Sequence, residues 1–140
     1  MRKRSNDFYM KKPGIGIIDT SKLRVFPEDH EYETARYFAD RGYDIEFIPP
    51  SNSPNIHTPD FIMDGVAWEV KCPTGKSKRT IENNFRKAIL QSDNIIFDLR
   101  RSGLPDDKTI PELERRFDQK GNVKRLMIIT KNGVLLRYSR

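Results

Sequence analysis

The sequence predicts a single α/β domain in which helices flank a central mixed β-sheet. Helix-like and strand-like patterns alternate along the chain, which is typical of helices packed on a sheet. Two dipeptides that favour tight hairpins, Asp64-Gly65 and Asn132-Gly133, lie between strand-like runs. With 140 residues, the chain is long enough for one domain with its own core.

Residues 23–140 are expected to form this domain, and residues 1–22, which are basic and polar, an N-terminal arm. Lysine and arginine number 26 against 20 acidic residues, so the net charge is +6. Such an excess attracts phosphate backbones or other anionic partners. The one cysteine excludes an internal disulfide. No apolar run approaches the length of a membrane span, and no membrane partner is expected.

The first helix is predicted over residues 28–41. Pro27 precedes an acidic first turn, and Gly42 supplies the stop. Glu31 lies four residues before Ala35 and therefore projects from the edge of the apolar stripe. Glu33 is turned about 200° from Glu31, at about 100° per residue, and is expected to face solvent.

The remaining elements follow from periodicity and turn residues. A strand is predicted at 43–48 and a hairpin at 58–71. A second helix follows at 78–91, with Ser77 as its N-cap. A buried strand is predicted at 94–99 and a polar loop at 100–108. A short helix at 111–119 and a hairpin of strands 126–130 and 134–138 complete the order.

The Asp64-Gly65 turn fixes the register of the first hairpin and places Asp60 directly opposite Glu69. Because strand side chains alternate, Asp60, Glu69 and Lys71 share one face. The other face is apolar and suits the core: Phe61, Met63, Val66, Trp68 and Val70.

Two carboxylates opposed in this way have Cβ atoms about 4.5–5.5 Å apart and repel each other unless a cation lies between them. Mg²⁺ is typically held by one or two carboxylates together with water and phosphate. Lys71, on the same face, could contact a phosphate oxygen or an attacking water. The alternative is a surface salt-bridge cluster, and a one-residue slip in register would separate these side chains.

The residues Pro59-Asp60 followed by Glu69-Val70-Lys71 resemble the PD-(D/E)XK signature of restriction-endonuclease-like phosphodiesterases. The run from Glu31 to Leu99 also resembles the nuclease toxin domains at the C-termini of contact-dependent growth-inhibition (CdiA) proteins, some of which cleave tRNA. The segments that carry this resemblance are TPD at 58–60, WEVK at 68–71 and Gln91-Ser92. Ile95 stands four residues after Gln91 where the RecB-like subgroup has tyrosine.

The resemblance implies a restriction-endonuclease-like fold and a set of roles. Asp60 and Glu69 would be ligands of Mg²⁺ or Mn²⁺. Lys71 would orient or help to deprotonate the attacking water, or stabilise charge on the phosphoryl group. Glu31 would be the additional acidic residue on the first helix, and its alternative role is that of a solvated first-turn glutamate.

Basic and polar side chains around the second helix are candidates for binding nucleic acid. The start of a helix favours anions, although runs of charge are more often solvated faces. Asn84 and Gln91, seven residues apart, lie on one edge of the predicted helix. The candidates are Lys76, Lys78, Arg79, Asn84, Arg86, Lys87 and Gln91.

Other polar residues are given structural roles. Cys72 should point away from Lys71 and be a small buried residue. Asp98, inside an apolar strand, requires a partner such as an arginine. One cysteine and two histidines are too few for a zinc site.

The expected function is therefore that of a metal-dependent endonuclease acting on RNA, with tRNA favoured, as a toxin domain. It would act in the cytoplasm after delivery by a larger protein, and an acidic immunity protein would be its partner. Two alternatives stay open: a DNA endonuclease of restriction, repair or mobile-element type, and a non-catalytic nucleic-acid-binding module, whose binding would be salt-sensitive and independent of metal.

Overall fold

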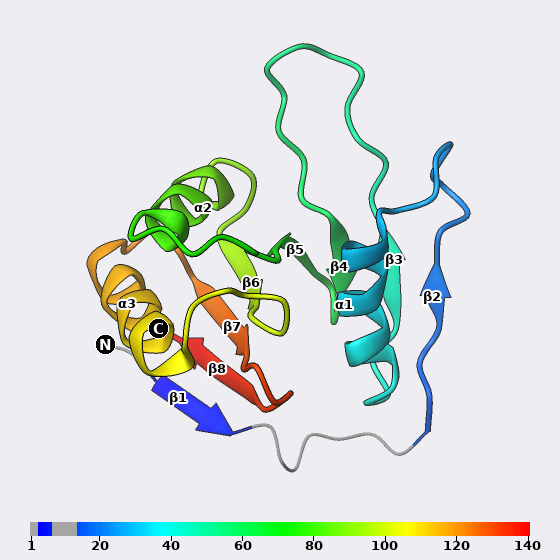
Figure 1. The fold of residues 1–140 in the computed structure, drawn as a ribbon. Coiled ribbons are helices and arrows are strands. Elements are labelled where there is room, and N and C mark those ends of the chain that lie inside the picture. Colours follow the sequence, from blue (N-terminus) through cyan, green and yellow to red (C-terminus); the bar gives the residue numbers. More distant parts are fainter. Residues whose placement is uncertain (1–2, 7–13) are drawn as a thin grey trace.

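The computed structural model describes residues 3–6 and 14–140, with side chains from residue 14 onward. Within them, a mixed eight-stranded sheet has the order β1-β8-β7-β6-β5-β4-β3-β2 and is accompanied by three helices (Figure 1). The strands are β1 Lys3–Asn6, β2 Ile18–Asp19, β3 Ile45–Phe47, β4 Phe61–Met63, β5 Val66–Lys71, β6 Asn94–Asp98, β7 Arg125–Ile129 and β8 Leu135–Ser139. The helices are α1 Asp29–Ala39, α2 Thr80–Ala88 and α3 Asp106–Gln119. The predicted α/β class with helices flanking a mixed sheet is confirmed.

The two faces of the sheet carry separate halves of the core. In β6, Ile95 and Phe97 pack with residues of α2 and α3, whereas Ile96 belongs to the cluster that includes Ala35 and Phe38 of α1. Figure 1 shows the same division, with α2 and α3 together and α1 over the strands β3 and β4. Burial of both faces explains why β6 is a nearly continuous apolar run.

The register predicted for the first hairpin is confirmed from Phe61 to Trp68. Met63 pairs with Val66, and Phe61 pairs with Trp68. Asp64 and Gly65 both adopt positive φ angles, 54° and 72°, as a two-residue type I′ turn requires. The turn chemistry therefore determined which side chains of β5 share a face.

The bounds of α2 and α3 differ from the sequence predictions, and α2 ends at Ala88 rather than at the predicted Gln91. The predicted N-cap at Ser77 is wrong: α2 begins at Thr80, and the Ser77 hydroxyl instead accepts the Arg79 N–H in a preceding turn. Helix α3 begins at Asp106, inside the predicted loop, and contains Pro111 in its interior. Its acidic first turn suits the positive end of the helix dipole, and this favours the earlier start.

Part of the predicted N-terminal arm belongs to the sheet. Strand β1 pairs with β8, and β2 pairs in parallel with β3. The Gly16 N–H donates to the Ala39 carbonyl, and a Cβ at Gly16 would lie only 1.8 Å from the Tyr43 carbonyl oxygen, so the close approach requires glycine. Residues 1–2 and 7–13 of the arm lie outside the described residues, and a domain boundary after residue 22 stays a prediction.

The prediction that Asp98 has an arginine partner is confirmed. Asp98 is buried, and its Oδ2 lies 2.7 Å from Nη2 of Arg100. The Thr34 hydroxyl of α1 donates to the same oxygen at 2.7 Å. This carboxylate therefore links the end of β6 to α1.

Replacement of Asp98 tests this link. Asp98→Ala leaves the Arg100 guanidinium and the Thr34 hydroxyl without their acceptor, and we expect the free energy of unfolding to fall by about 3 kcal/mol in urea denaturation. The matched control is Glu82→Ala, which removes an exposed ion pair with Arg79 and should leave the unfolding midpoint unchanged. An equally small effect of both substitutions contradicts the structural role of Asp98.

Candidate active site at the end of the β4–β5 hairpin

Asp60 occupies the point at which β4 and β5 separate. The Asp60 N–H donates to the Trp68 carbonyl at 2.9 Å, so the regular ladder stops one step before the expected Asp60–Glu69 pair. Beyond that point the Val70 N–H donates to Oδ2 of Asp60 at 2.8 Å. The carboxylate thus replaces the missing strand partner of β5, and the β5 backbone fixes its position.

Glu69 and Lys71 form an ion pair on β5, as their shared face predicts. Oε2 of Glu69 lies 3.0 Å from Nζ of Lys71, with both side chains largely withdrawn from solvent. Nζ of Lys71 also donates to Oε1 of Gln91 at 3.2 Å. The other Glu69 oxygen, Oε1, is buried without a hydrogen-bond partner among the described residues.

Glu31 approaches Asp60 from α1. Its side chain accepts the Glu28 N–H at 3.3 Å in a capping box at the start of the helix. The negative charges of Glu31 and Asp60 act on each other, as do those of Asp60 and Glu69. Glu33 is exposed, so the predicted distinction between these two glutamates of α1 is confirmed in geometry.

The three carboxylates all have raised pKa values. Burial, followed by the negative charge of Glu69, raises the pKa of Asp60 to about 7, although the hydrogen bond from Val70 opposes the shift. Burial also raises the pKa of Glu69, with Lys71 acting in the opposite direction. For Glu31, burial and then the charge of Asp60 raise the pKa. The site thus concentrates more negative charge than Lys71 alone compensates.

The donor set fits a hard divalent cation. Carboxylate oxygens are the ligands that Mg²⁺ and Mn²⁺ prefer, and a buried oxygen such as Oε1 of Glu69 normally has a partner. Within residues 14–140, no three His, Cys, Asp or Glu side chains are arranged so as to hold an ion. A bound cation would therefore use Asp60 and Glu69 and complete its shell with water and substrate oxygens.

A cleft of about 460 Å³ opens beside these groups. Glu31, Asp60 and Gln91 line it together with side chains from two loops, residues 23–28 and 48–59. No sequence pattern predicted this wall, because its residues come from segments without periodicity. They include Val25, Phe26, Ile56 and His57.

Of the seven side chains predicted to bind nucleic acid, Gln91 enters the site. It follows the end of α2, in a turn where its N–H donates to the Ala88 carbonyl. Asn84 is engaged within its own helix, donating to the Thr80 carbonyl. The five basic residues are exposed outside the cleft lining, and their role stays a prediction: Lys76, Lys78, Arg79, Arg86 and Lys87.

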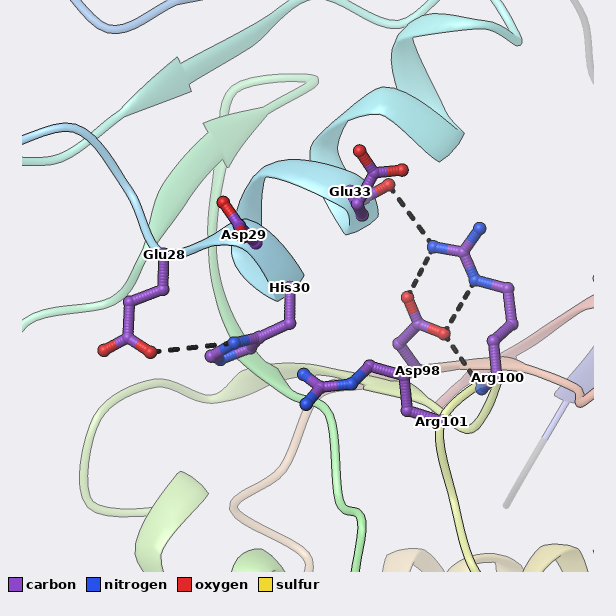
Figure 2. Close-up of a pocket in the computed structure, with 7 residues that line it drawn as sticks. All are labelled: Glu28, Asp29, His30, Glu33, Asp98, Arg100 and Arg101. Carbon is purple, nitrogen blue, oxygen red and sulfur yellow. Dashed lines mark hydrogen bonds and ion pairs between the residues drawn. The ribbon is translucent and has the colours of Figure 1, made fainter.

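A second pocket, of about 650 Å³, lies on the other side of the start of α1. Figure 2 shows the Asp98–Arg100 pair on its wall, where Arg100 also reaches the Glu33 carbonyl, and the ion pair of Glu28 with His30. Its lining mixes acidic and basic side chains, and the Asp98–Arg100 pair there already serves the fold.

Cys72 points away from Lys71, as predicted. It packs against the α1 side of the core, with its sulfur 3.4 Å from the Thr34 hydroxyl. Burial raises the pKa of the thiol to about 11, so it is not a thiolate nucleophile at neutral pH.

Comparisons with known proteins place the site within a family. The family model described as "Contact-dependent growth inhibition CdiA C-terminal domain" matches residues 57–135, which include Asp60, Glu69, Lys71 and Gln91. A solved structure of a CdiA-CT/CdiI toxin and immunity complex from Burkholderia pseudomallei is similar in fold, with a TM-score of 0.65. The two chains are 18% identical over 89% of this chain and 100% of the other.

No curated protein is similar enough to match the chain. Among the described residues, no helix is both long and apolar enough to span a membrane. The family model covers more than half of the sequence, including the whole hairpin that carries the candidate site. The chain belongs to the family of contact-dependent growth inhibition CdiA C-terminal domains.

Proposed function

We propose that this domain is a metal-dependent endonuclease that hydrolyses phosphodiester bonds in RNA, with tRNA as the favoured substrate, and that it acts as a toxin. The observation that carries the proposal is the position of Asp60 beside Glu69, whose Oε1 is buried without a hydrogen-bond partner among the described residues and whose Oε2 lies 3.0 Å from Nζ of Lys71. Membership of the CdiA C-terminal family supports a toxin role.

Each residue of the site has a distinct task in this proposal. Asp60, held by the Val70 N–H, and Glu69 would hold Mg²⁺ or Mn²⁺. The bound cation would polarise the phosphate and lower the pKa of a water ligand. Lys71 has three N–H donors, of which Glu69 and Gln91 accept two. The third is available for the attacking water or for a phosphate oxygen.

The reaction is hydrolysis of one ester bond. The oxygen of water bonds to phosphorus as the bond to the leaving oxygen breaks, and negative charge accumulates on the phosphoryl oxygens. Lys71 is placed to stabilise that charge in a site partly withdrawn from solvent, where a fixed positive group is worth more than in water. Glu31 would add negative charge beside Asp60 from the α1 side and so favour a bound cation.

The resemblance to toxin domains favours RNA over DNA as the substrate. A comparison of tRNA, single-stranded DNA and duplex DNA as substrates distinguishes an RNA endonuclease from a DNA endonuclease. An immunity protein is proposed as partner because the structurally similar protein is described as a toxin and immunity complex. The net charge of +6 favours an acidic partner. The proposed site of action is the cytoplasm of a target cell, after delivery by a larger protein.

Substitution of the site residues tests the proposal directly. With Mg²⁺ present, the wild-type protein should cleave tRNA, and Asp60→Asn or Lys71→Ala should lower kcat by at least about 100-fold, because each removes charge that is needed in the transition state. Glu33→Gln, on the exposed face of α1, is the matched control and should cleave at the wild-type rate. Full activity in both site variants contradicts the assignment.

Gln91 is expected to act through Lys71. Gln91→Ala removes the neutral acceptor that holds the ammonium group, and we expect kcat to fall about 10-fold with little change in KM, a smaller loss than Lys71→Ala causes. Asn83→Ala, which removes a comparable amide contact with Arg86 on the exposed side of α2, should change neither constant. A rise in KM alone would instead indicate that Gln91 binds substrate.

Asp60 should make the metal-free protein less stable as pH rises. Its pKa in the folded state, about 7, exceeds its ordinary value of 3.8, so between these values the folded protein binds more protons than the unfolded chain. Stability therefore falls as pH rises through this range. In EDTA, the free energy of unfolding of Asp60→Asn, relative to that of the wild type, should rise by about 2 kcal/mol between pH 5 and pH 8, as measured by urea denaturation.

Asp64→Asn, at the exposed hairpin turn, is the control for this pH series and should keep the wild-type slope. At pH 8, added Mg²⁺ should raise the melting temperature of the wild type, because binding to the folded state alone stabilises it, and should not raise that of Asp60→Asn. An identical response of both proteins to pH and to Mg²⁺ would mean that the carboxylates form no cation site.

A further inference from the structure

The cleft beside the acidic site has an unusually apolar wall for a surface exposed to water. Val25, Phe26 and Ile56 line it and are 80%, 61% and 57% exposed. These three are among seven large hydrophobic side chains that are exposed within the described residues. Their gathering at one cleft indicates that a ligand covers this wall.

The Phe26 part of the wall is supported by α1. The Phe26 ring packs against Tyr32 of α1, with the ring centroids 5.0 Å apart and the planes tilted by 39°. Earlier in the chain, the Leu23 N–H donates to the Thr20 carbonyl and closes a turn before Phe26. The facing loop, residues 48–59, starts at the end of β3 and ends at Asp60 (Figure 1). Phe26 therefore has a supported ring with a large part of its surface open.

The same cleft reaches the groups that would bind the phosphate. Its lining includes Glu31 and Asp60, and also Gln91, which is bonded to Lys71. In a nucleic acid each phosphate is joined to a base through one sugar, so the cleft that adjoins the carboxylates is within reach of a base next to a phosphate bound there. His57 and Thr58 line that space and offer hydrogen-bonding groups to the edge of a base.

We propose that this cleft receives an unpaired nucleobase next to the scissile phosphate, with Phe26 as its stacking platform. The inference rests on the proposed nuclease function and specifies its substrate class: a nucleotide in a loop or at an unpaired end. A base within a duplex has both faces covered by its neighbours and its pairing edge occupied, whereas an unpaired base can be placed on an aromatic side chain.

Kinetics on two forms of one RNA test this inference. The probes are a stem–loop RNA and the same RNA with its loop paired to a complementary strand, each with Mg²⁺. The wild type should cleave the loop and lose at least about 10-fold in kcat/KM on the paired form. Phe26→Ala should raise KM for the loop about 10-fold with kcat nearly unchanged, because stacking on the aromatic ring stabilises the bound substrate and the transition state equally.

Phe26→Trp should restore the KM, because indole is also a stacking surface. The single native tryptophan, Trp68, is buried, so quenching of the new indole by the stem–loop RNA in EDTA reports binding in the cleft directly. Ile17→Ala, which truncates a side chain 68% exposed outside the cleft lining, is the control and should leave both constants unchanged.

Failure of this inference is distinguishable from failure of the nuclease proposal. If the wild type cleaves with Mg²⁺ and Asp60→Asn does not, the nuclease proposal stands whatever Phe26 does. Wild-type KM in Phe26→Ala, or equal cleavage of the looped and paired RNA, then overturns the base site and leaves the apolar wall to a protein partner. Absence of cleavage by the wild type overturns both.

Discussion

The hydrogen bond from the Val70 N–H to the Asp60 carboxylate is the contact on which the site depends. It is made where the β4–β5 ladder ends, so a side chain takes the place of a strand partner. Because β5 lies inside the sheet, between β4 and β6, the carboxylate is fixed to an interior strand. Glu69 and Lys71 lie on the same strand, and their spacing relative to Asp60 follows from this one contact.

The cost of the arrangement is electrostatic. Three acidic groups come together where burial already disfavours their charged forms, and the pKa of each is raised. One ammonium group, shared between Glu69 and Gln91, does not balance them. Such concentrations of perturbed carboxylates are characteristic of functional sites, and here a cleft adjoins them.

The sequence predicted those parts of the structure that local chemistry determines. The Asp64-Gly65 turn gave the register, the alternation in β5 gave the shared face of Glu69 and Lys71, and helical periodicity separated Glu31 from Glu33. The isolated polar residue in β6 correctly indicated a charged partner for Asp98. In each case, the prediction rests on the geometry of one strand, turn or helix, and that local geometry is the same in the folded structure.

Other features depend on contacts between distant segments and left no local signal. The bond between Gln91 and Lys71 requires α2 to end at Ala88, and the cleft wall joins Phe26 to Ile56 across loops without periodicity. Strand β1 has four residues and is defined by its partner β8. The polar composition of residues 100–108 predicts a loop, whereas Asp106 and Asp107 form the first turn of α3.

The central claim is that Asp60 and Glu69 jointly bind a divalent cation at the open end of the hairpin. Its most direct test is an anomalous difference map from crystals of the wild-type domain grown with Mn²⁺. We expect a peak about 2.1 Å from Oε1 of Glu69 and from an oxygen of Asp60. A map with no peak between these two carboxylates, from crystals in which Mn²⁺ is bound elsewhere on the protein, would contradict it.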